Sequence, residues 1–171
     1  MNDQPSRHEP SLPPGSPVTG GAGSHVTAQP ARPNAAPTNL APAIALDPRG
    51  LPIGYPFKPE WEVTPRDAAA SLLEDGASRP VLLDCRRDEE WAFNRIAGAV
   101  HVPMSEIERR ADELEDERGG RAGPIIVQCH HGVRSLRVTA ALRALGFTNV
   151  KSLAGGIDLW SLTVDSSVPR Y

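Results

Sequence analysis

The most informative segment of the sequence is Ile125-Ile126-Val127-Gln128-Cys129-His130-His131-Gly132-Val133-Arg134-Ser135. Its first three residues are an aliphatic run, which predicts a short buried β-strand. A loop with one glycine follows, and apolar side chains then recur at helical spacing until Gly146, which predicts an α-helix. A strand that passes directly into a helix is the repeating unit of parallel α/β proteins.

The same alternation of strand and helix signals continues on both sides of this stretch. Further strands are predicted at 81–83, 99–102 and 149–153. Further helices are predicted at 65–74, at 88–93, from Ser105 through Leu114 and at 156–161. Thr64 and Pro65 are typical of a helix start, as N-cap and first helical residue. Because short buried strands separated by helices form parallel sheets covered on both faces, residues 61–171 are expected to be a three-layer α/β domain.

The N-terminal third has a different composition. Most of the 18 prolines lie before residue 61, and residues 1–40 contain almost no large apolar side chains. Such a segment cannot bury enough surface to offset its ordering entropy, so we expect a disordered Pro/Ala/Gly-rich tail. Residues 41–60 include Leu51, Tyr55 and Phe57 among turn-forming residues. We expect them to form an extended arm laid over the domain, with a free linker as the alternative.

Composition and charge exclude several classes of partner. The chain has 18 Lys and Arg against 21 Asp and Glu, a net charge of −3, whereas an unassisted nucleic-acid binder normally carries a basic excess. No apolar run approaches the ~20 residues of a membrane span, and the first residues lack the pattern of a secretory signal. We therefore expect no nucleic-acid or membrane partner, reduced cysteines and a cytoplasmic location. We also expect a monomer.

Cys129 is the reactive group that the predicted topology places most clearly. A thiol between a strand end and a helix N-terminus faces unpaired backbone N–H groups and the positive end of the helix dipole, both of which stabilise the thiolate. Gly132 allows the loop to curl so that N–H groups point inward, and Arg134 adds a permanent positive charge. The pattern predicts a cradle for an anionic sulfur species or an oxyanion. A buried cysteine that only packs is the alternative.

Four segments between residues 61 and 165 resemble the motifs of rhodanese-like sulfurtransferases, in the order of that family. The loop from Cys129 to Ser135 resembles the active-site loop. Asp84-Cys85-Arg86 resembles the family's Asp-x-Arg element. Arg95-Ile96-Ala97-Gly98-Ala99, followed by Pro103, resembles its Gly-His-Ile-Pro-Gly-Ala segment. The segment from Leu153 to Trp160 resembles its Gly-Gly-x-x-x-Trp ending. The chain departs from the pattern at Asn94-Arg95, where Gly-His is commoner, and at Cys85, where a small aliphatic residue is usual.

The resemblance implies a fold and a function. The fold would be a rhodanese-like domain with a mainly parallel five-stranded sheet flanked by helices. Cys129 would take a sulfane sulfur as a persulfide and pass it to a cyanide or thiol acceptor, with Arg134 acting beside it. The donor would be thiosulfate, or a small-molecule or protein persulfide, and no cofactor would be needed. The substrate-binding loop would consist of His130, His131, Gly132, Val133 and Ser135.

Two other functions remain open at this stage. Four residues separate Cys129 from Arg134, the spacing that the family uses for sulfur transfer, whereas related phosphatases have one residue more. A Cys-based phosphatase or arsenate reductase is therefore one alternative. The other is a non-catalytic binding or regulatory module of the same fold, in which the Pro-rich tail binds the partner.

The supporting residues also allow two interpretations each. Asp84 and Arg86 either support the Cys129 loop by hydrogen bonds or form an ion pair that fixes a strand end. His130 and His131 either line the pocket with partial positive charge or contribute only backbone N–H groups. No metal is expected, because adjacent residues in a tight loop rarely converge on one ion. Cys85 is expected to pack in the core, with a resolving thiol as the alternative.

Overall fold

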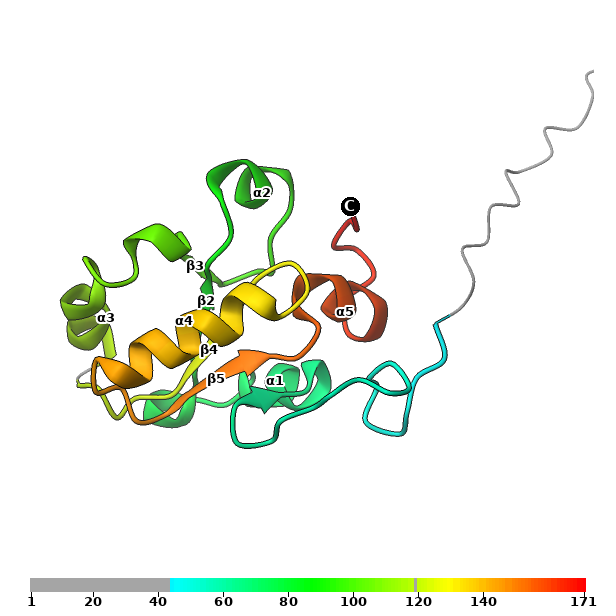
Figure 1. The fold of residues 1–171 in the computed structure, drawn as a ribbon, viewed down its shortest axis with the longest axis horizontal. Coiled ribbons are helices and arrows are strands. Elements are labelled where there is room, and N and C mark those ends of the chain that lie inside the picture. The colour runs from blue at the N-terminus through cyan, green and yellow to red at the C-terminus, as the bar shows by residue number, and fades with distance from the viewer. Residues whose placement is uncertain (1–43, 119) are drawn as a thin grey trace, which may run out of the picture. The chain divides into compact units, whose positions relative to one another are not determined.

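The computed structural model describes residues 44–118 and 120–171 (Figure 1). The tail predicted for residues 1–40 lies outside the described residues. The rest of the chain forms a five-stranded sheet in the order β1-β5-β4-β2-β3. Every strand pair in it is parallel. The fold class predicted from the sequence is therefore confirmed.

The elements alternate along the chain as the sequence predicts. The strands are β1 (Glu62–Val63), β2 (Val81–Asp84), β3 (Val100–His101), β4 (Ile125–Gln128) and β5 (Val150–Leu153). The helices are α1 (Pro65–Ser71), α2 (Asp88–Phe93), α3 (Ala111–Arg118), α4 (Val133–Ala144) and α5 (Gly156–Thr163), with short 3-10 turns η1 (Gly76–Ser78) and η2 (Met104–Glu106). Helix α1 begins at Pro65, where the Thr64 side chain accepts a hydrogen bond from the backbone N–H of Asp67.

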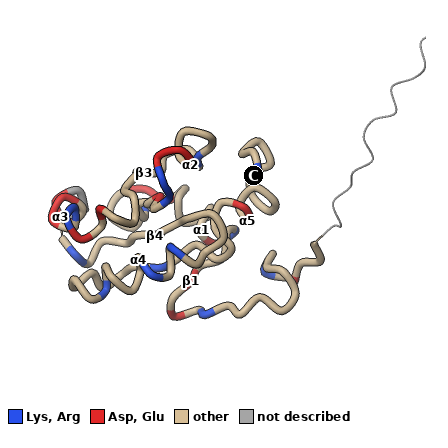
Figure 2. The backbone as a smooth tube through the Cα atoms, turned by 45° about the horizontal axis from the view of Figure 1, so that its top comes forward, with Lys and Arg blue, Asp and Glu red and all other residues tan. Residues whose placement is uncertain are grey.

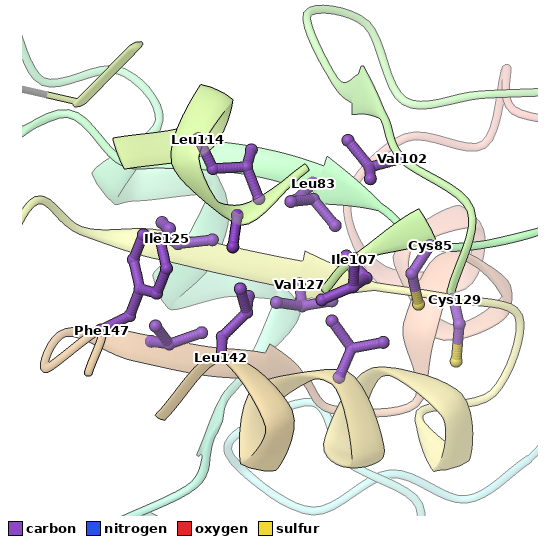
Figure 3. Close-up of a cluster of buried hydrophobic side chains, with 13 residues drawn as sticks. Leu83, Cys85, Val102, Ile107, Leu114, Ile125, Val127, Cys129, Leu142 and Phe147 are labelled. Carbon is purple, nitrogen blue, oxygen red and sulfur yellow. The ribbon is translucent and has the colours of Figure 1, made fainter. Parts of the chain in front are cut away.

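Neighbouring residues of the central strands point to opposite faces of the sheet, and each face is covered by helices. In β2, Leu83 packs toward α3 and α4, while Leu82 packs toward α1 and α5. The α3/α4 side of the core is drawn in Figure 3, where Leu83, Val127, Leu114 and Leu142 meet between the sheet and the helices. The two buried clusters make the three layers of the domain.

Three element boundaries differ from the prediction. Helix α1 ends at Ser71 rather than 74, because the backbone N–H groups of Leu73 and Glu74 bond three residues back, as in a tighter turn. The helix predicted from Ser105 is interrupted: η2 ends at Glu106, and α3 begins at Ala111. Ile107, Ala111 and Leu114 are nevertheless all buried. Strand β3 has only two residues, because it is an edge strand that pairs with β2 alone.

The segment 44–60 packs on the domain before β1. Leu51 is fully buried and belongs to a cluster with Ala154 and Leu159. The Tyr55 hydroxyl donates to Glu62 Oε1 at 2.7 Å and accepts from the backbone N–H of Gly155 at 3.0 Å. A residue from this segment therefore helps to fix the start of α5. No helix within 44–118 or 120–171 is long and apolar enough to cross a membrane.

Candidate active site

Cys129 lies at the carboxyl end of β4, directly before the loop that leads into α4, and is only 1% exposed. The first turn of α5 holds this loop, because the backbone N–H groups of Ile157 and Asp158 donate to the carbonyls of Cys129 and His130 at 2.9 and 3.2 Å. Gly156 makes this approach possible. A Cβ at Gly156 would lie 2.3 Å from the Cys129 carbonyl oxygen.

Two backbone N–H groups point at the sulfur. The N–H of Gly132 donates to Cys129 Sγ at 3.2 Å, and that of Ser135 donates at 3.4 Å. Gly132 has φ of 99°, a left-handed conformation that glycine adopts without steric cost and that curls the loop around the sulfur. The loop therefore has the inward-facing N–H groups of an anion-binding nest.

A pair of serines extends these contacts. The Ser135 hydroxyl lies 3.5 Å from Cys129 Sγ, 3.0 Å from the Gly132 carbonyl oxygen and 2.8 Å from the Ser152 hydroxyl. Since Ser135 has one hydroxyl proton, Ser152 can donate to Ser135 while Ser135 donates to either the carbonyl or the sulfur. Sequence reasoning did not identify Ser152, because nothing near it on β5 marks it as part of this loop.

The two free cysteines lie at the same end of the α3/α4 core, and Figure 3 shows their sulfur atoms there. A hydrogen bond from the Cys85 thiol lowers the pKa of Cys129 to about 5; burial opposes this shift, and Ser135 and Gly132 add to it. The same contact, together with burial, raises the pKa of Cys85. The pKa of Cys129 is thus shifted toward the thiolate form and that of Cys85 toward the thiol form.

Arg134 lies at the loop, but its charge is compensated. Its two terminal nitrogens donate to the two carboxylate oxygens of Glu90, each at 2.6 Å. This ion pair lowers the pKa of Glu90 to about 2 and raises that of Arg134. The sequence analysis missed Glu90, because it is one of three consecutive acids that open α2 and nothing local distinguishes it.

Aromatic rings stack over the loop. His130 lies between His131, with ring centroids 3.7 Å apart, and Tyr171, with centroids 4.0 Å apart. Burial and the neighbouring His131 lower the pKa of His130. These shifts disfavour the protonated form of the ring, and the role of the two histidines at the pocket stays a prediction.

His130, His131 and Asp158 are also the one group of potential metal ligands found in the described ranges 44–118 and 120–171, with ligand atoms within 4.8 Å of one another. Arg170 donates two hydrogen bonds to the Asp158 carboxylate. The two imidazole rings are stacked at an interplanar angle of 24°. Nearly parallel rings direct their nitrogen lone pairs side by side, not toward one ion.

Asp84 and Arg86 form a fully buried ion pair at the end of β2, with a closest approach of 2.6 Å. Arg86 also donates to the Asn94 side chain and backbone carbonyl, at 2.7 and 2.8 Å, and to the Tyr171 hydroxyl at 3.0 Å. Asn94 in turn donates to the Pro169 carbonyl. The pair thus joins the strand end to the segments after α2 and α5, and Asn94, at the departure from the family motif, is part of that link.

Comparisons with known proteins agree with this geometry. A family model described as the rhodanese-like domain matches residues 65–163. Thiosulfate sulfurtransferase GlpE of Pseudomonas fluorescens is 35% identical over 106 residues, which cover 61% of this chain and 88% of that protein. Adenylyltransferase and sulfurtransferase UBA4 of Candida albicans is 28% identical over 119 residues, which cover 68% of this chain and only 27% of the longer relative.

Solved structures show the same likeness. The human single-domain sulfurtransferase TSTD1 aligns with a TM-score of 0.50 at 27% identity, covering 60% of this chain and 96% of the human one. A rhodanese-related protein from Thermoplasma volcanium aligns with a TM-score of 0.52 at 27% identity, covering 61% and 93%.

Fold and site together define a parallel α/β domain with a single activated cysteine in an N–H-lined loop at the carboxyl end of its sheet. The chain belongs to the rhodanese-like domain family. Relatives of this family that the chain resembles are named sulfurtransferases.

Proposed function

We propose that this chain is a sulfurtransferase that carries a sulfane sulfur as a persulfide on Cys129 and passes it to a cyanide or thiol acceptor. Cys129 is the nucleophile in this proposal. The loop from His130 to Ser135 binds the transferred sulfur, and the Arg134 side chain lies at the outer side of this loop. A small-molecule or protein donor supplies the sulfur, and the chemistry needs no cofactor.

The single observation that carries the proposal is the environment of Cys129 Sγ. Two backbone N–H groups donate to it, and the neighbouring Cys85 thiol lowers its pKa. These contacts hold the pKa near 5, so the sulfur is a thiolate at neutral pH, and the thiolate is the nucleophilic form. The donors are neutral, so they stabilise a sulfur anion without forming a strong ion pair with it.

The reaction divides into two balanced displacements. In the first, the Cys129 thiolate attacks the outer sulfur of the donor; a new S–S bond forms as the donor's own S–S bond breaks, and sulfite or a thiolate leaves with the bonding electron pair. In the second, the acceptor attacks the outer sulfur of the persulfide, and the Cys129 thiolate leaves with its electron pair. The protein returns to its starting state without net oxidation.

Intact-mass measurement tests the proposal. Incubation with thiosulfate or a thiol persulfide should add one sulfur atom to Cys129, reversibly with dithiothreitol, and cyanide should then release one equivalent of thiocyanate. The Cys129→Ser variant should show neither, because a hydroxyl cannot hold a sulfane sulfur. A wild-type chain that takes up no sulfur and releases no thiocyanate would instead indicate a binding module.

A further inference from the structure

The mouth of the Cys129 loop is the set of side chains Glu90, His130, His131, Arg134 and Tyr171. At its centre the Glu90 carboxylate accepts four hydrogen bonds. Two come from Arg134 at 2.6 Å each, one from the Tyr171 hydroxyl at 2.9 Å and one from the backbone N–H of Arg87 at 3.1 Å. The Glu90 and Arg134 side chains are only 19% and 27% exposed. Glu90 is therefore held in one orientation, with both oxygens on the guanidinium.

The other charges beside the loop are compensated in the same way. Arg170 makes two hydrogen bonds to Asp158, at 2.7 and 3.1 Å. Burial and the neighbouring His131 lower the pKa of the half-buried His130 ring, which disfavours a positive charge there. Arg134 and Arg170 thus each have their own carboxylate. Glu90 itself belongs to the acidic first turn of α2 (Figure 2).

This charge balance bears on the choice of sulfur donor. Thiosulfate carries two negative charges, so its attack by the Cys129 thiolate brings three negative charges together, and sulfite leaves as a dianion. An unpaired guanidinium at the mouth would offset this repulsion, but Glu90 cancels the charge of Arg134. A thiol persulfide brings at most one negative charge at its reacting end and leaves as a monoanionic thiolate. The neutral N–H donors of Gly132 and Ser135 suffice for such a species.

We propose that Glu90 is a specificity-determining residue that, by closing the ion pair with Arg134, makes this site select a thiol persulfide as its sulfur donor over the thiosulfate dianion. This inference rests on the proposed function, since it concerns the first displacement at Cys129. The step is the attack of the Cys129 thiolate on the outer sulfur of R–S–SH, which forms the Cys129 persulfide and releases R–S⁻.

The test compares two donors on matched variants. Glu90→Gln removes the negative charge and frees Arg134, while Glu89→Gln makes the same change at the exposed neighbouring position on α2. The measured quantity is the second-order rate constant for loading Cys129, read by intact mass after rapid quenching with an alkylating agent. The donors are sodium thiosulfate and cysteamine persulfide, whose ammonium group keeps its net charge low.

Wild type should load faster from cysteamine persulfide than from thiosulfate. Glu90→Gln should raise the thiosulfate rate constant about tenfold, as removal of one charge near a dianion predicts, and should change the persulfide rate constant by less than about twofold. The gain should shrink in high salt, because added ions screen the charges. Glu89→Gln should match wild type with both donors. Persulfidated serum albumin is the third donor. Its rate constant for loading Cys129, compared with that of cysteamine persulfide, distinguishes a protein-borne persulfide donor from a free one.

Two outcomes would overturn the inference. One is a Glu90→Gln variant whose thiosulfate rate constant stays at the wild-type value. The other is an equal change with both donors, which would indicate a structural role for the ion pair. If the donors load wild type but do not separate the variants, only the donor assignment fails. If no donor loads Cys129 in wild type, the proposed function itself fails.

Discussion

The Cys129 sulfur is surrounded by groups that lie far apart in the sequence. Gly132 and Ser135 belong to its own loop, whereas Cys85 follows β2 on the neighbouring strand. The Arg134 guanidinium, which is the nearest candidate for a stabilising cation by sequence, is bound to Glu90 instead. Short-range contacts, first the neighbouring Cys85 thiol and then Ser135 and Gly132, therefore lower the pKa of Cys129.

A prediction at this scale concerns thiol reactivity. The pKa of Cys129 is near 5, below the ~8.5 of a free thiol, so its alkylation rate should rise through pH 5 and be level by pH 7. The Cys85 thiol, whose pKa is raised, should stay unmodified over that range. Iodoacetamide labelling against pH, with peptide mass spectrometry for each cysteine, measures both. A Cys129 that titrates above pH 8 would contradict the thiolate assignment.

A second prediction concerns the donor from Cys85. Cys85→Ala removes that hydrogen bond, so the pKa of Cys129 should rise and the midpoint of its alkylation curve should move to higher pH. Cys85→Ser keeps a donor at the same position and should shift the midpoint less. Because Cys85 is buried, the Ala variant should also lose about 1 kcal/mol of stability, measured by urea unfolding. An unchanged midpoint in Cys85→Ala would show that the donor contact is not what acidifies Cys129.

At the scale of elements, the start of α5 sets the shape of the β4–α4 loop. Its backbone N–H groups bind the Cys129 and His130 carbonyls, and this approach depends on two glycines with positive φ, Gly155 and Gly156. The loop is thus held from behind by an element that follows it in sequence by more than twenty residues. That contact holds the Cys129 and His130 carbonyls at the start of the loop in place.

Gly156→Ala should therefore disturb the site more than an ordinary glycine substitution. The added Cβ meets the Cys129 and His130 carbonyls at 2.3 and 2.4 Å, so the loop must shift, and we expect a loss of about 2–3 kcal/mol together with a large fall in the Cys129 loading rate. Gly54→Ala is the matched control, since Gly54 also has positive φ but nothing within 4 Å of the added Cβ. Gly54→Ala should lower the free energy of unfolding by about 1 kcal/mol and leave the rate of Cys129 loading unchanged. Equal behaviour of the two variants, by unfolding and by loading, would refute the role of α5.

At the scale of the whole domain, two segments outside the sheet close over the same end. Residues 44–60 reach Gly155 through Tyr55. Residues after α5 lie between α2 and α5 (Figure 1), where Tyr171 contacts Glu90 and Arg170 contacts Asp158. The site thus depends on parts of the chain that precede and follow the strand–helix repeat.

Leu51 tests whether the first of these segments stabilises the domain. Its side chain is fully buried against Ala154 and Leu159, so Leu51→Ala should lower the free energy of unfolding by about 2–4 kcal/mol. Ile53→Ala, two residues away at a position that is 72% exposed, should change it by less than about 0.5 kcal/mol. Urea denaturation of the full chain compares them. A Leu51 variant as stable as the Ile53 variant would mean that this segment adds nothing to the fold.

Local patterns determined most of the fold. The aliphatic runs around Leu82 and Ile126 predict strands whatever their neighbours, because residues of that kind have to be buried. Helix caps such as Thr64 act within one turn, so the start of α1 was also predictable. Strand boundaries that depend on pairing were not predictable from the sequence. β3, for example, is an edge strand that pairs with β2 over two residues only.

At the candidate site, the sequence alone determined the position of the thiol. A strand, a cysteine, a glycine and a helix are contiguous, so the direction of the Gly132 and Ser135 N–H groups follows from local geometry. Only the tertiary structure decided the electrostatics. Glu90, Cys85, Ser152 and Tyr171 reach the loop from other elements. A charge or hydrogen bond acts according to distance in space, and a local pattern carries no information about which of many acids, thiols or hydroxyls will lie at that distance.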